Sequence, residues 1–214
     1  MKRITAALIG IIWLVSSLWG ASITHTSSVF PQTTNWVLTN SVPQFDGVLG
    51  TLTNVTITVA VNTSTRLRVE NRDTSPWLTY AASEVTATGT AAGYSATTTL
   101  TNSYTTTLSE YDGVLDYGGT SGFNVVVVGV DSGTASPSDF TPFIGSGTIP
   151  LMTSASAVGV YEGSGDWRFI VNTQASALVT VTYEFSPPVC PSCDPEPEEC
   201  DDRNDRRKSR NRRR

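Results

Sequence analysis

A period-two alternation of apolar and hydroxylic residues is the feature that most constrains the fold of this chain. In residues 55–61 valine and isoleucine alternate with threonine and alanine, and in residues 66–70 leucine and valine alternate with arginine and glutamate. Similar alternation returns in residues 167–172 and 179–185. A side-chain period of two is that of a β-strand with one buried and one solvated face, which is typical of antiparallel sheets.

We therefore predict an all-β fold, an antiparallel β-sandwich of about eight to ten strands. The chain of 214 residues contains 32 Thr and 24 Ser but only two Lys, a composition that favours strands over helices. Residues 123–130 are almost continuously apolar, which predicts a central strand.

One short helical turn is expected. Ser136 is a candidate N-cap, Pro137 suits the first helical position, and Asp139 places a carboxylate near the helix start. Pro142 keeps this turn short. The adjacent Phe140 and Phe143 are expected to plug one end of the sandwich.

The N-terminus has the three-part pattern of a secretory signal peptide. Lys2 and Arg3 precede an uncharged, mainly apolar run over residues 4–15, and small residues follow. That run is shorter than the roughly 20 residues of a membrane span. We expect residues 1–21 to be a signal peptide, with cleavage close to Gly20 or Ser22, and the protein to be exported. An uncleaved N-terminal anchor is the alternative.

The C-terminal residues 187–214 differ in character from the rest of the chain. They hold seven acidic and eight basic groups and a single aliphatic residue, whereas residues 21–186 hold twelve acidic and four basic groups. Such a tail buries too little apolar surface to offset its ordering entropy, so we expect disorder. The predicted units are the signal peptide, a sandwich domain over residues 22–186, and this tail. The acidic domain disfavours nucleic acid as a ligand.

All three cysteines, Cys190, Cys193 and Cys200, lie in the predicted tail. A Cys-x-x-Cys spacing also occurs in redox pairs and zinc sites, but this one has neither a βαβ setting nor a nearby histidine. Oxidation is expected after export, and an odd number leaves one thiol over. We hypothesise disulfide-linked self-association.

Few residues suit catalysis, so we expect a protein that is not an enzyme. The single histidine, His25, follows the expected cleavage site, where chains fray. Asp112, Asp116, Asp131 and Asp139 are candidates for paired catalytic carboxylates or, if they converge in space, for calcium ligands. Asp112 and Asp131 stand in turn-forming sequences, which favours bonding to their own backbone. No cofactor is predicted, and calcium binding stays a hypothesis.

The aromatic residues suggest a second class of function, carbohydrate binding. Trp36, Trp77 and Trp167 offer rings that can stack on sugars. Trp167 alternates with Phe169 and is expected in the core. Trp77 follows a turn at residues 73–76, so we predict it as the exposed ligand-binding residue, packing in the core being the alternative.

Several segments, taken in order, resemble the bacterial choice-of-anchor E domain. They cover nearly all of residues 28–186 and are Thr33–Trp36, Val42–Leu52, Val55–Ile57, Tyr111–Gly122, Asp139–Phe140, Phe143–Ile149 and Val179–Tyr183. The resemblance implies an exported, all-β, non-catalytic surface domain of the kind that precedes interchangeable C-terminal sorting signals. It implies no established ligand and no catalytic residues. Residues 195–197 and the closing arginines are similar to the outer parts of a PEP-CTERM signal, but charged residues replace its membrane span.

Together these features predict an exported structural or interaction domain at the cell surface or in the extracellular matrix. Its expected partners are matrix or envelope components such as polysaccharide, or a second copy of the chain, with no nucleic acid and no transmembrane span in the mature chain. The alternative is a carbohydrate-binding module. A hydrolase would require two carboxylates that face each other across a cleft.

Overall fold

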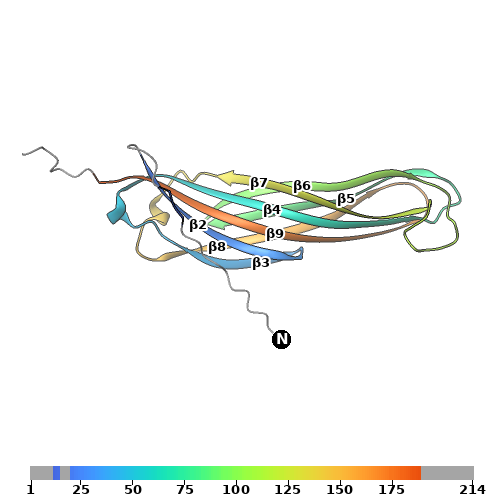
Figure 1. Cartoon of the computed structure of the whole chain (residues 1–214), viewed down its shortest axis with the longest axis horizontal. Coiled ribbons are helices and arrows are strands. Elements are labelled where there is room, and N and C mark those ends of the chain that lie inside the picture. The colour runs from blue at the N-terminus through green and yellow to red at the C-terminus, as the bar shows by residue number, and fades with distance from the viewer. Residues whose placement is uncertain (1–11, 15–19, 189–214) are drawn as a thin grey trace, which may run out of the picture.

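Two antiparallel β-sheets pack face to face in this protein (Figure 1), so the predicted all-β antiparallel sandwich is confirmed. The computed structural model describes residues 12–14 and 20–188. Sheet A has the strand order β1-β2-β9-β4-β7, and sheet B has the order β3-β8-β5-β6. The strands are β1 (Ile12–Leu14), β2 (Ala21–Thr33), β3 (Trp36–Pro43), β4 (Thr51–Asn71), β5 (Trp77–Ala91), β6 (Tyr94–Leu108), β7 (Gly122–Ala135), β8 (Thr148–Glu162) and β9 (Trp167–Ser186).

The strands run along the long axis, which makes the molecule elongated (Figure 1). β4 has 21 residues and pairs with the 20 residues of β9 along nearly its whole length. A strand of this length extends over about 70 Å. We call the end with the 3-10 turns η1 (Gly47–Leu49) and η2 (Thr141–Phe143) the cap end. The opposite end, where residues 109–121 connect β6 to β7, is the loop end.

The prediction of a central strand at residues 123–130 is wrong, because these residues form β7 at the edge of sheet A. The inner strands of sheet A are β2, β9 and β4. Val126, Val128 and Val130 point away from the core and are 55%, 73% and 75% exposed. A strand is buried on both faces only where other elements cover both faces of its sheet. Nothing in the described part of the chain covers the outer face of β7.

A belt of buried polar residues divides the core into two hydrophobic clusters. The larger cluster lies toward the cap end, and the smaller one lies toward the loop end. Between them the Asn102 amide donates to the hydroxyls of Thr63 and Thr65 at 2.8 and 2.9 Å. The Thr173 hydroxyl is 3.1 Å from that of Thr65 and 2.8 Å from that of Ser83. This polar belt therefore links both sheets through hydrogen bonds.

The helical turn predicted from Ser136 lies instead at η2, a few residues later. The Asp139 carboxylate accepts the backbone N–H of Thr141 at 2.9 Å, just before this later turn, whose N-cap residue is Phe140. Phe143 is fully buried in the core and Phe140 packs against it, which confirms that the two rings plug one end of the sandwich.

The C-terminal residues 189–214, with Cys190, Cys193 and Cys200, lie outside the described residues, so the predicted cysteine linkage stays a prediction. Within the described residues, no helix has the length and apolar character needed to span a membrane.

Candidate functional site

The outer face of sheet A carries a hollow of about 350 Å³ toward the loop end. Its lining residues come from three neighbouring strands. Arg66 on β4 stands opposite Val126 on β7 and Asn172 on β9, and Ser64 stands opposite Gln174. Facing residues of antiparallel neighbours share one face of the sheet, so strand pairing alone gathers this set. We call the site the sheet A hollow; a guanidinium, two amides, a hydroxyl and one apolar side chain line it.

Three of the four arginines of residues 21–186 belong to this face. Arg66 and Arg168 are exposed, and Arg68 is half-buried. The guanidinium carbon of Arg68 lies 5.4 Å from the centre of the Tyr117 ring, within range of a cation–π interaction. The fourth, Arg72, is 3.7 Å from the Asp166 carboxylate. A domain with twelve acidic and four basic groups thus concentrates positive charge on one face.

Glu70 holds the loop of residues 109–121 against the same face. The side chain is fully buried, and its two oxygens accept the backbone N–H of Tyr117 at 2.6 Å and the hydroxyl of Ser121 at 2.7 Å. The alternation placed Glu70 on the solvated face, and the face is correct, but the loop covers it. The available signal was a carboxylate at the end of one strand together with a glycine-rich loop that leads into the strand paired with it.

The aspartates singled out in the sequence are bonded to their own surroundings. Asp112, Asp116 and Asp139 each accept the backbone N–H two residues further along, at 2.9, 2.8 and 2.9 Å, which is the expected turn geometry. The turn predicted at Asp131 is wrong, because this residue lies within β7 and pairs with Val61 of β4. Asp131 accepts the hydroxyl of Thr98, and this hydrogen bond lowers the pKa of Asp131. Within the described residues, no group of three or more His, Cys, Asp or Glu side chains is placed to hold a metal ion.

His25 is not in a frayed segment, so that expectation is wrong. It lies in β2, which pairs with β9, and its side chain is only 6% exposed. The imidazole packs edge-on against the Tyr183 ring at a centroid distance of 5.7 Å. Burial lowers the pKa of His25 because the charged form loses its hydration. Burial likewise raises the pKa of Tyr183 to about 12, and the Tyr183 hydroxyl donates to the carbonyl of Pro43 at 2.9 Å.

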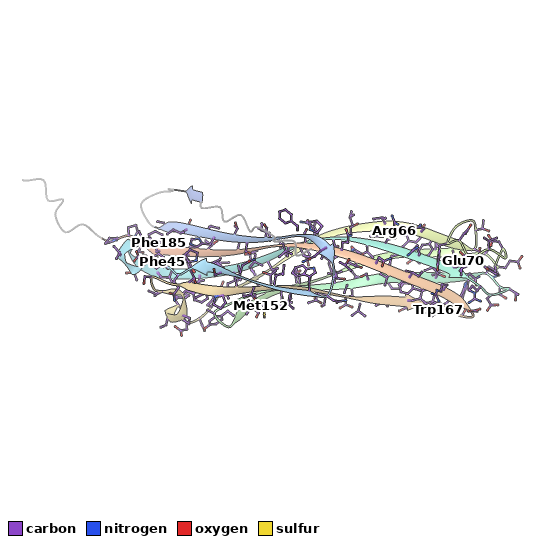
Figure 2. All side chains as sticks on the ribbon, turned by 90° about the horizontal axis from the view of Figure 1, so that it is seen from below. Phe45, Arg66, Glu70, Met152, Trp167 and Phe185 are labelled. Carbon is purple, nitrogen blue, oxygen red and sulfur yellow. The ribbon has the colours of Figure 1, made fainter. Side chains whose placement is uncertain are left out.

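The exposure expected for two tryptophans is reversed in the structure. Trp77 is half-buried and packs against the smaller core cluster, and its indole N–H has no acceptor in the described part of the chain. Trp167 is 40% exposed at the loop end (Figure 2) and lies against Tyr161 with ring centroids 4.1 Å apart. The Trp167 side chain points to the inner face, as the alternation predicts. It is nevertheless exposed because β2 and β3 do not extend to the loop end.

A second hollow, of about 370 Å³, lies on sheet B near the same end. Tyr80 and Glu162 face each other across β5 and β8, and Leu78, Thr105 and Gly163 complete the lining. We call it the sheet B hollow. Leu78 is 65% exposed, so this hollow presents apolar surface together with a carboxylate and hydroxyls.

Comparisons with known protein families, curated proteins and solved structures found no significant match to this chain. The likeness to the choice-of-anchor E domain therefore rests on the sequence segments that carry it. The described residues thus form two polar hollows, one on the outer face of each sheet, and the sheet A hollow carries the positive charge.

Proposed function

We propose that the protein is an exported, non-catalytic structural or interaction domain of the choice-of-anchor E type, acting at the cell surface or in the extracellular matrix. The observation that carries the proposal is the elongated sandwich itself. Its core extends along the strands, and the four aspartates considered as candidate catalytic groups are bonded within the fold. A rigid rod with hydrated faces suits a spacer or matrix component.

The outer face of sheet B supports the same proposal. Hydroxyl pairs bridge β5 and β6 in consecutive rows, at distances of 3.1, 3.2 and 2.8 Å; the pairs are Thr86–Thr99, Thr88–Thr97 and Thr90–Ser95. The two hydroxyls of each row hydrogen-bond to each other, and their remaining lone pairs and O–H group can hydrogen-bond to water. A surface of this kind stays hydrated and offers many weak polar contacts.

Fractionation of the producing cells tests the proposal. Cytosol, envelope and medium are blotted for the protein, with and without reductant. We expect the shortened, processed chain in the envelope or medium, and a slower species without reductant that reductant removes. Retention of the unprocessed chain in the cytosol would refute export, and equal mobility in both gels would refute the cysteine linkage.

A second candidate function, binding of a neutral glycan, is favoured by the exposed ring of Trp167 next to Tyr161. A glycan array is probed with the wild-type protein, with Trp167→Ala and with Trp77→Ala. A ligand that stacks on the exposed ring is lost in Trp167→Ala, whereas Trp77→Ala reports the residue expected from sequence. Silence of the wild-type protein on the whole array removes this candidate.

A further inference from the structure

We propose that the sheet A hollow binds a carboxylate-bearing polysaccharide, with Arg66 as the residue that recognises the carboxylate. This inference rests on the proposed location outside the cell and adds a site and a class of partner to it. Arg66 lies on the outer face toward the loop end (Figure 2), with its side chain exposed. Its planar guanidinium matches the two oxygens of a carboxylate.

The neighbours of Arg66 fit the rest of a sugar acid. Asn172 and Gln174 each present an amide that donates and accepts hydrogen bonds, as sugar hydroxyls do. Ser64 adds a hydroxyl. Val126, on the other side of Arg66, offers apolar contact for the C–H groups of a sugar ring. A hollow of about 350 Å³ is at the small end of ligand sites, which span roughly 300–1,000 Å³.

The distribution of charge directs an acidic polymer to this face. Arg68 flanks Arg66 on the same strand, and Arg168 lies further along on β9. Glu70, the carboxylate nearest the hollow on this face, is buried and bonded by the loop, so the loop separates it from solvent. The exposed Glu184 lies on the same face but toward the cap end, where the Asn54 amide donates to it. The remaining acidic groups of the domain repel a polyanion from other surfaces.

The open face also suits a polymer better than a small isolated anion. Outward residues on β4 recur every second position, so Asn62, Ser64, Arg66 and Arg68 form a line about 20 Å long. The matching positions on β9 are Ser176, Gln174, Asn172 and Ile170. A polysaccharide chain that lies along this line meets polar side chains from two strands in three of the four rows, and in the fourth it meets Arg68 beside Ile170. Proteins that bind single-stranded nucleic acid commonly add aromatic rings on which bases stack, and these lines of residues on β4 and β9 contain none.

Binding of the full exported chain to sodium polygalacturonate tests the site, with neutral dextran, dextran sulfate and single-stranded DNA as comparison polymers. Arg66→Ala is compared with Arg72→Ala, which removes the same charge from an arginine bonded to Asp166. Affinity electrophoresis at about 50 mM and about 500 mM NaCl separates specific binding from screened attraction. Thermal melts establish that both variants fold.

We expect polygalacturonate to bind more tightly than dextran sulfate or DNA and dextran not to bind. Arg66→Ala weakens binding by roughly tenfold or more, and Arg72→Ala changes it by less than about twofold. Equal loss in both variants, no loss in either, or equal binding of DNA would overturn the inference, because the site or its specificity would then lie elsewhere. The fractionation experiment tests export separately, so a failure of this binding test can be distinguished from a failure of the proposed location.

Discussion

The buried Glu70 provides the strongest test of how the loop end is held together. Glu70→Leu keeps most of the side-chain volume but removes both acceptors, so the N–H of Tyr117 and the hydroxyl of Ser121 lose their partner. An unsatisfied buried donor costs about 1–3 kcal/mol. Two such donors are lost here, and movement of the loop and removal of a buried charge offset part of the cost. We therefore expect the free energy of unfolding to fall by about 2–4 kcal/mol.

Urea denaturation measures this loss directly, and for a domain of this size it corresponds to a Tm lowered by about 5–15 °C. Glu70→Gln should recover most of the stability, because its carbonyl oxygen can accept the Tyr117 N–H while its amide donates to Ser121. Limited proteolysis should show faster cleavage within residues 109–121 of the Glu70→Leu variant than of the wild-type protein.

Glu84→Gln is the matched control, since Glu84 is exposed on β5 and the substitution removes the same charge. Its free energy of unfolding should stay within about 0.5 kcal/mol of wild type. A Glu70→Leu variant within that same range, or one that leaves the loop equally resistant to protease, would refute the role assigned to Glu70.

Three further predictions concern the core. The pKa of His25 is lowered in the folded protein, so below about pH 6.5 the unfolded chain binds the proton more readily than the folded chain. Stability should therefore fall as the pH decreases from about 7 to about 5. Thermal melts of the wild-type protein should show this fall in Tm, and those of His25→Gln should lack it. Thr173→Val leaves two buried hydroxyls of the polar belt without this partner and should lower the free energy of unfolding in urea by about 1–3 kcal/mol. Gly133→Ala places a methyl group against the backbone carbonyl of Thr97 and should cost about 1–3 kcal/mol, while Gly47→Ala, whose Cβ comes no closer than 3.9 Å to a neighbour, should change Tm little.

The sequence alone allowed prediction of the all-β fold, of segments of β4, β7 and β9, and of the face to which residues of β4 and β9 point. Alternation placed Trp167 on the inner face and Arg66 and Glu70 on the outer face, as observed. It could not show whether anything covers a given face, because cover depends on segments distant in sequence. Trp167 is exposed since the neighbouring strands stop short, and Glu70 is buried since a loop crosses it.

The sheet A hollow was beyond prediction for a related reason. Arg66 and Asn172 are far apart in the chain and meet only because β4 pairs with β9 in one register. Local patterns fix the period of a strand but leave its partner and its offset open. The order of strands was equally hidden, which is why an apolar run was expected in the centre of a sheet and is found at its edge.

The polar belt explains how strands of such repetitive sequence reach a single register. A slip of one residue turns every side chain to the wrong face, but a slip of two keeps valine inward and threonine outward over much of β4. In the observed register Thr65 faces Thr173 across β4 and β9, and Asn102 reaches both Thr63 and Thr65 from the other sheet. A two-residue slip of β4 would bring Val61 or Leu67 to the Asn102 amide in place of one threonine and leave one of its two donors buried without an acceptor, at about 1–3 kcal/mol. We infer that the belt selects the register. The same register sets Arg66 beside Asn172, so the proposed recognition site on the surface depends on hydrogen bonds in the core.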